Sequence, residues 1–270
     1  GFGATYCYRV VAVMPDGSRS KVGPEACAEI DKGVPVMTGA SVEVSDASGG
    51  EIEVRWSPPT DADTLEAFPG PYRYVLEARA ESGTGWSIIH EGPSAALLWE
   101  LDTVHVHLGV DSEGTRWTYR VTAWSGEDAI GVSTPAPVPE LQLGPADNSM
   151  VLSVPPGRPW FDTAYVFQRI LSDGVPVLLD TVSAPLFVDT GLVNGIPVCY
   201  RVRTLGTYGS ADILDPIENW SAIRCATPYD TEPPCPPVFE VEADCAEEVA
   251  RLRWWPSPCA EDITGYRLYR

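Results

Sequence analysis

The chain repeats one ten-residue phrase three times, and this repeat limits its possible folds more than any other feature. Each copy has a glycine, three variable residues, and a Cys or Thr followed by Tyr-Arg-Val, and the copies are residues 3–12, 114–123 and 195–204. Apolar residues alternate with polar ones in each copy, which is typical of a β-strand with one buried face. The copies are a domain length apart, so the sequence predicts a tandem array of β modules.

The alternation also predicts which side chains point inward. In the first copy these are Tyr6, Tyr8, Val10 and Ala12, and their counterparts in the second are Trp117, Tyr119, Val121 and Ala123.

Further predicted strands have the same alternation and are also bounded by turn-forming residues. Apolar and polar residues alternate in residues 51–56 and 249–255. These segments contain Trp56 and Trp254, and a proline-rich turn follows each of them. A tyrosine-containing strand is predicted after each acidic loop, at residues 72–78, 165–170 and 266–269. With 24 Gly and 26 Pro among 270 residues, many short strands are expected. The predicted fold class is all-β, built from immunoglobulin-like sandwiches.

The charge excludes several partners. Lys and Arg number 18 against 38 Asp and Glu, for a net charge of −20. Nucleic acids and anionic membrane surfaces both require a basic footprint, so neither is an expected partner. No stretch of about 18 apolar residues is present, so direct membrane insertion is not expected either.

The residues so far quoted resemble fibronectin type III modules. Trp56 before Pro58-Pro59 matches the core tryptophan of the second strand of that fold, and Tyr6 matches its corner tyrosine. The region after residue 144 departs from the pattern: Val198 takes the corner position, and Leu152 and Val154 stand where the tryptophan is expected, with Trp160 nearby. The resemblance implies the same fold with a rebuilt core.

A narrower resemblance covers nearly the whole chain. It rests on the phrases at residues 10–18, 67–74, 189–195, 219–228, 233–238 and 259–266. Together they look like the fibronectin-type tail of large Bacteroidota surface proteins that carry a gliding-motility-associated C-terminal domain. The resemblance implies export by type IX secretion and a role related to gliding or adhesion.

Joints rich in Gly, Pro and Asp divide the chain. Residues 34–143 and 144–229 are predicted to be complete modules, residues 1–33 the last two strands of a module, and residues 230–270 the first three strands of another. A bare hairpin is marginal on its own. We interpret the two halves as parts of a longer chain, and the alternative is that halves from different chains complete each other.

The seven cysteines indicate disulfides and hence an oxidising compartment. None forms a Cys-x-x-Cys pair, and the histidines are distant in sequence, so zinc-site spacing is absent. Cys7 and Cys27 are predicted to pair across a hairpin, as are Cys199 and Cys225, whereas residues 34–143 contain no cysteine and have Thr118 at the matching place. Cys235–Cys259 is the third predicted pair, which leaves Cys245 without a partner in the chain.

Several side chains suggest chemistry, but each of them also has a simpler structural explanation. His105 and His107 alternate on one strand face and could bind a metal, but a solvated strand face is the preferred interpretation. Asp61, Asp63, Glu261 and Asp262 lack calcium-loop order and are interpreted as solvating charge. The same Asp61 and Asp63, or Asp215 and Glu218, could suggest the paired carboxylates of a glycosidase, but no sequence feature supplies a pocket. Catalytic, metal and cofactor sites are therefore all predicted to be absent.

Three functional hypotheses remain open. The first is a non-enzymatic stalk of a large secreted protein, displayed on the outer face of the outer membrane after passage through the periplasm. Its partners would be neighbouring modules of the same longer chain and type IX components of the outer membrane. The second is a binding module for a glycan or a secretion partner, and the third is an accessory region of a secreted enzyme. The stalk is the favoured hypothesis.

Overall fold

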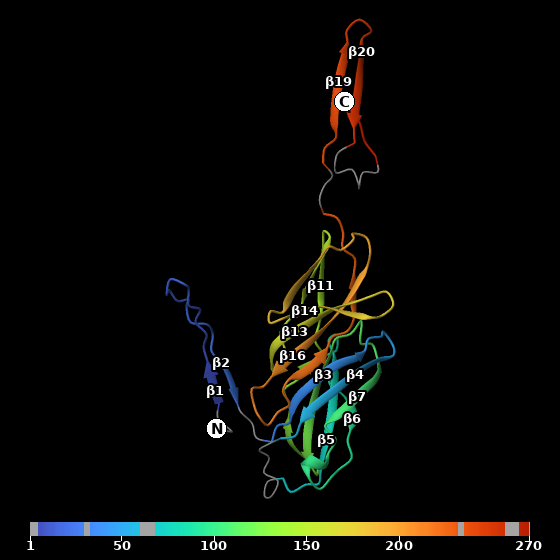
Figure 1. Ribbon diagram of the computed structural model, residues 1–270. Helices are drawn as coiled ribbons and strands as arrows, with labels where there is room; N and C mark the ends of the chain where they lie inside the picture. Colours follow the sequence, from blue (N-terminus) through green and yellow to red (C-terminus); the bar gives the residue numbers. More distant parts are fainter. Residues whose placement is uncertain (1–4, 30–32, 60–67, 232–234, 257–264, 270) are drawn as a thin grey trace.

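The computed structural model describes residues 5–29, 33–59, 68–231, 235–256 and 265–269 (Figure 1). Its regular elements in these ranges are β-strands, apart from the one-turn 3₁₀ helix η1 (Leu98–Glu100). The strands form two packed sandwiches in the middle of the chain and one separate hairpin toward each end.

The first sandwich lies between residues 36 and 137 and consists of two antiparallel sheets. One sheet has the order β3-β4-β7, and the other has the order β10-β8-β5-β6, with β9 also paired to β8. The strands are β3 (Val36–Val44), β4 (Gly50–Ser57), β5 (Tyr72–Ala80), β6 (Ser87–Glu91), β7 (Val104–Val110), β8 (Trp117–Ser125), β9 (Asp128–Val132) and β10 (Ala136–Pro137).

The second sandwich, between residues 142 and 226, repeats this topology strand for strand. Its sheets have the orders β11-β12-β15 and β14-β13-β16-β17, with β18 also paired to β16. The strands are β11 (Gln142–Ala146), β12 (Ser149–Ser153), β13 (Phe161–Ile170), β14 (Pro176–Val182), β15 (Leu186–Thr190), β16 (Val198–Thr207), β17 (Ile217–Trp220) and β18 (Arg224–Ala226). The predicted all-β, immunoglobulin-like sandwich fold is confirmed.

The alternating residues fill the first core as predicted. Trp56 is only 4% exposed and packs edge-on against Tyr74, with ring centroids 5.6 Å apart. Tyr119, Val121 and Ala123 are fully buried on β8, because one face of the strand is covered by the opposite sheet. Aromatic side chains thus supply much of the buried apolar area.

The second core is built without a tryptophan on its second strand. Leu152 and Val154 are buried there, and Phe167 stacks on Phe187 with ring centroids 5.7 Å apart. Trp160 does not replace the missing tryptophan in this core. It packs instead with the first core cluster, next to Tyr208.

The two hairpins leave much of their apolar faces exposed to solvent. They are β1 (Thr5–Tyr8) with β2 (Ala26–Glu29), and β19 (Val238–Asp244) with β20 (Val249–Trp255). Trp254, predicted to point inward, is 48% exposed, because no second sheet packs on it among the described residues. The strand predicted at residues 266–269 is wrong: these residues pair with no strand in the described part of the chain.

The two sandwiches dock through β3, which is buried on both faces. From the second sandwich, Asn219 is fully buried, and its Oδ1 accepts a hydrogen bond from the Ala40 N–H at 2.7 Å. The Trp220 N–H donates to Ser41 Oγ at 2.9 Å, and Arg55 Nη2 donates to the Glu218 carbonyl at 2.9 Å. We call this contact between β3–β4 and β17 the junction.

Close approach at the junction depends on small residues. A Cβ at Gly39 would lie 2.9 Å from Arg55 Nε and 3.4 Å from Asn219 Oδ1. The Tyr208 hydroxyl also donates to the Met37 carbonyl at 2.9 Å. Asn219 Oδ1, Ser41 Oγ and the Met37 carbonyl thus each accept a hydrogen bond across the junction, and these bonds fix how the two sandwiches are aligned.

Candidate functional site

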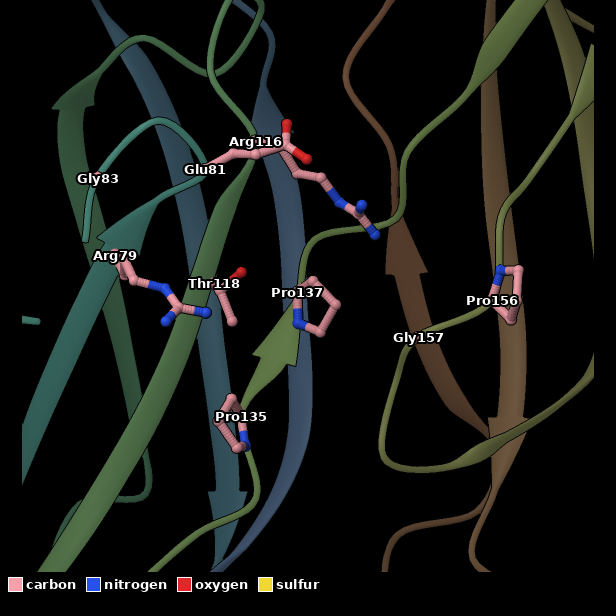
Figure 2. Close-up of a pocket in the computed structure, with 9 residues that line it drawn as sticks. All are labelled: Arg79, Glu81, Gly83, Arg116, Thr118, Pro135, Pro137, Pro156 and Gly157. Carbon is pink, nitrogen blue, oxygen red and sulfur yellow. The ribbon is translucent and has the colours of Figure 1, made fainter. Parts of the chain in front are cut away.

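A polar groove of about 540 Å³ lies beside the short edge strand β10, where a loop of the second sandwich approaches the first (Figure 2). We call it the β10 groove. Its lining combines charged side chains, one hydroxyl, three prolines and two glycines: Arg79, Glu81, Gly83, Arg116, Thr118, Pro135, Pro137, Pro156 and Gly157.

Arg79 is held in the groove by an aromatic ring. Its guanidinium lies 4.7 Å from the ring centroid of Trp86, a distance at which cation–π attraction is effective. On the neighbouring strand Thr118 is its cross-strand partner, and Figure 2 shows the guanidinium extending toward Thr118. Arg79 is half-buried, and it forms no ion pair with any residue that the structure describes.

The neighbouring arginines differ from Arg79 in having carboxylate partners. Arg120 also stacks on Trp86, but its Nε lies 2.8 Å from Glu77 Oε2. Arg116 lines the groove, and its Nη1 lies 3.1 Å from Glu140 Oε2. Arg79 is therefore the guanidinium in the groove that remains open to an outside acceptor.

The groove occupies the position that a disulfide takes in the corresponding hairpins. Cys7 faces Cys27 between β1 and β2, and Cys199 faces Cys225 between β16 and β18. In the first sandwich the matching pair between β8 and β10 is Thr118 opposite Pro137, and both residues line the groove. The Thr118 hydroxyl and the Pro137 ring thus take the place of a cross-strand disulfide.

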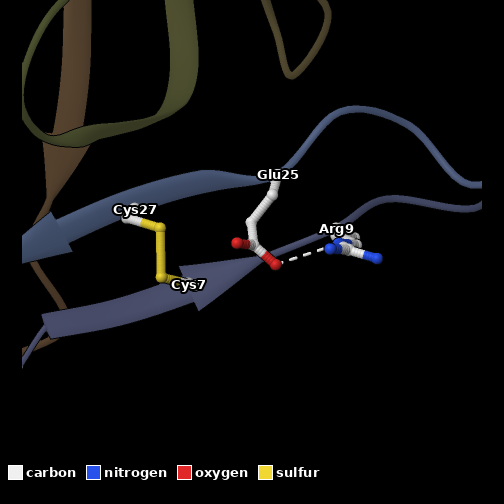
Figure 3. The surroundings of a disulfide bond; sticks show 4 residues. All are labelled: Cys7, Arg9, Glu25 and Cys27. Atoms are coloured by element: carbon white, nitrogen blue, oxygen red, sulfur yellow. Dashed lines mark hydrogen bonds and ion pairs between the residues drawn. A yellow bond between two sulfur atoms is a disulfide. The ribbon is translucent and has the colours of Figure 1, made fainter.

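The two disulfides predicted for these hairpins are present. They are Cys7–Cys27, shown in Figure 3 beside the ion pair of Arg9 with Glu25, and Cys199–Cys225. Cys235 also takes part in a disulfide, and its predicted partner Cys259 lies outside the described residues. Cys245 is free and exposed.

The described residues bring three potential metal ligands together at one place, Cys7, Glu25 and Cys27. The two sulfur atoms are bonded to each other, and Glu25 is paired with Arg9. These ligands are therefore committed to the covalent and ionic structure of the hairpin (Figure 3).

A second polar groove, of about 360 Å³, lies at the junction and contains the carboxylates of Asp215 and Glu218. Asp215 accepts a hydrogen bond from the Thr207 hydroxyl at 3.0 Å, and Glu218 pairs with Arg203 at 2.9 Å. Each carboxylate therefore has a structural partner. The other acidic candidates, Asp61, Asp63, Glu261 and Asp262, lie outside the described residues.

The histidines do not form a solvated strand face, and that prediction is wrong. His105 is half-buried and stacks on His90 of β6, with ring centroids 4.2 Å apart. His107 is half-buried against Trp117, and its Nδ1 lies 3.1 Å from the Tyr119 hydroxyl. The reason is that the edge strands β6 and β7 of the two sheets meet here, so this face of β7 is covered.

Burial shifts the pKa values of His105, His107 and Tyr119. It lowers the pKa of His107, and it lowers the pKa of His105 with a smaller contribution from the neighbouring His90 and His107. Burial also raises the pKa of the Tyr119 hydroxyl. The neutral forms are favoured, as in an ordinary packed core.

One buried polar network joins three strands of the second sandwich. The Tyr200 hydroxyl donates to Asp189 Oδ2 at 2.8 Å, and Arg169 Nε donates to the same oxygen at 3.0 Å. Burial, followed by the hydrogen bond to Asp189, raises the pKa of Tyr200. The network satisfies its own donors and acceptors and lines neither groove.

No family model matches the chain. Among solved structures, it resembles the FN1–FN3 domains of chicken CNTN1, with 12% identity, 85% of this chain and 76% of that chain covered, and a TM-score of 0.27. A two-domain fibronectin type III segment of chicken tenascin is 20% identical, with coverage of 71% and 98% and a TM-score of 0.22. The chicken interferon gamma receptor alpha chain is 13% identical, with coverage of 72% and 98% and a TM-score of 0.25.

The order of the strands in the two sandwiches defines the fold. The chain folds into tandem fibronectin type III-like β-sandwiches. No helix within the described ranges is long and apolar enough to cross a bilayer.

Proposed function

We propose that this chain is a non-enzymatic spacer segment of a large secreted cell-surface protein, with module boundaries near residues 34, 144 and 230. The observation that carries the proposal is the junction, where a buried asparagine and two serines of neighbouring sandwiches exchange hydrogen bonds with backbone groups. Such a contact holds two modules at a fixed angle, as a stalk requires.

Composition and covalent structure agree with this role. The disulfides staple two of the hairpins, and disulfides persist in oxidising compartments. A net charge of −20 favours solubility and disfavours adhesion of the stalk to anionic surfaces.

The resemblance of the sequence to gliding-associated surface proteins extends the proposal to export. The parent protein would cross the periplasm, leave by the type IX machinery and stand on the outer face of the outer membrane. An antibody against this segment should label intact cells that make the parent protein. In cells lacking the type IX machinery, retention in the periplasm is expected, and unchanged surface labelling would refute the export route.

Rigidity is tested on the full chain by a distance measurement. Spin labels are placed at the exposed positions Ser82 and Ser183, in separate sandwiches, after Cys245→Ser removes the free thiol. Pulsed electron resonance should give one narrow distance distribution. A broad distribution would contradict the spacer.

The same labels test the junction directly. Asn219→Ala leaves the buried Ala40 N–H without an acceptor, which costs about 1–3 kcal/mol. We expect the distance distribution to broaden in this variant. Gln142→Ala, which removes an exposed amide from β11, is the matched control and should leave the distribution unchanged.

A further inference from the structure

The β10 groove goes beyond the spacer function. We propose that it binds a carboxylated sugar, such as a uronic acid residue carried by an otherwise neutral glycan. Arg79 would bind the carboxylate, while Thr118 and Glu81 would bind ring hydroxyls.

Arg79 lacks a carboxylate partner within the described part of the chain. In a chain with 38 acidic and 18 basic side chains, this half-buried guanidinium forms no ion pair among the described residues. Trp86 holds it at 4.7 Å, so its donor fork is already positioned on the Thr118 side of the groove. A planar carboxylate is the acceptor that matches such a fork.

The groups around Arg79 are mixed in charge and polarity. An exposed carboxylate, Glu81, also lines the groove and would repel a bare anion. A sugar acid resolves this conflict, because its hydroxyls donate to Glu81 while its carboxylate accepts from Arg79. The rings of Pro135, Pro137 and Pro156 add flat C–H surface against which a sugar ring can pack.

The β10 groove lies where the corresponding strand pairs have a disulfide. In β1–β2 and β16–β18 this cross-strand position is closed by a disulfide, whereas β8 and β10 place Thr118 and Pro137 there. The groove of about 540 Å³ is within the usual size range of small-molecule sites.

The overall charge limits the ligand further. A net charge of −20 repels a polyanion as a whole. A glycan with isolated acidic residues meets the guanidinium without this penalty. The structure therefore favours an occasional sugar acid over a polyuronate.

The test is a titration of the full chain followed by amide-resolved NMR. Sodium glucuronate and glucose form the matched probe pair, since they share the ring and differ in the carboxylate. Glucuronate should shift the amide signals of residues 79–83 and Thr118 saturably, whereas glucose should not. Arg79→Gln should weaken the affinity at least tenfold.

Two further variants keep the result decisive. Arg73→Gln removes an arginine that stacks on Trp124 of the same sheet but does not line the groove, and it should leave glucuronate binding unchanged. If Arg79→Gln does not fold, Arg79→Lys keeps the charge and loses the fork, and it should still bind more weakly than the unmodified chain.

Several outcomes would overturn the proposal. Equal binding of glucose would remove the role of Arg79. Equal binding of acetate or sulfate would show an adventitious ion only, and binding of an acidic peptide without glucuronate would assign the groove to a protein partner. Absence of any saturable shift would also overturn it, and none of these results would bear on the rigidity of the spacer.

Discussion

Two regions of this chain share the same alternating strand pattern, but their apolar side chains lie in opposite environments. In the first sandwich, Trp56 is 4% exposed and Tyr119 is fully buried. In the hairpins, the corresponding Trp254 is 48% exposed and Tyr8 is 65% exposed. The alternation of residues therefore determines which face of a strand is apolar. Burial of that face depends on whether a second sheet is present to cover it.

The largest expected effect is on stability, where the buried Trp56 and the half-exposed Trp254 should differ. Trp56→Ala should destabilise the sandwiches by about 3–5 kcal/mol, because it removes a buried aromatic side chain and leaves a cavity. Trp254→Ala should cost less than about 1 kcal/mol, since that side chain is half exposed. Urea unfolding of the full chain, followed by circular dichroism, measures both. Similar losses from the two variants would show that Trp254 is covered in solution.

The second largest effect on stability is expected from removing a disulfide. Replacing Cys199 and Cys225 together with serine should cost about 3 kcal/mol, because the disulfide closes a loop with a sequence separation of 26. The matching double replacement of Cys7 and Cys27 lies in a separate hairpin. It should leave the unfolding transition of the sandwiches where it was, and a shift would reveal a contact between that hairpin and the sandwiches.

A smaller effect is expected from pH. The folded-state pKa values of His105 and His107 lie below the ordinary value of 6.5, so below about pH 6.5 the unfolded chain binds more protons. Their contribution to stability is present above pH 6.5 and is lost as the pH falls through the depressed pKa values.

His90, the Tyr119 hydroxyl and Trp117 are the neighbours described for these two histidines. Carboxylate protonation also acts in this range, so the variant His105→Gln separates the contributions. Its stability should decline less steeply than that of the unmodified chain between about pH 7 and 5.5. Identical slopes would rule out a contribution from His105.

The smallest effect is at Cys245. As the free, exposed cysteine of the described chain, it should react with a maleimide without denaturant, and Cys245→Ser should leave unfolding unchanged. Mass spectrometry counts the label. A protected thiol would indicate that Cys245 is covered or bonded in solution.

Much of the fold could be predicted from the sequence because strand alternation is a local property. Trp56, Tyr119 and Val121 are buried where the repeat places them, and the Thr118 position was recognised by the paired absence of cysteines. The rebuilt second core could also be placed at Leu152 and Val154.

The junction and the groove could not be predicted in this way. Asn219 and Ser41 are small polar residues that would be ordinary on a solvated strand, and only docking makes them fully buried. The groove brings together Arg79 and Pro156, which are far apart in sequence and belong to different sandwiches. The inward position of His105 likewise depends on β6 of the other sheet, which no local pattern reports.

The double burial of β3 has a consequence for how such proteins diversify. Proteins built of tandem modules evolve by duplicating, deleting and reordering their units. A crossover between the two sandwiches would separate Ala40 from Asn219 and expose an interface that has no other use. Recombination outside residues 33–231 would preserve both partners. The pair of sandwiches is therefore expected to be inherited as one unit, and related chains should gain or lose the two together.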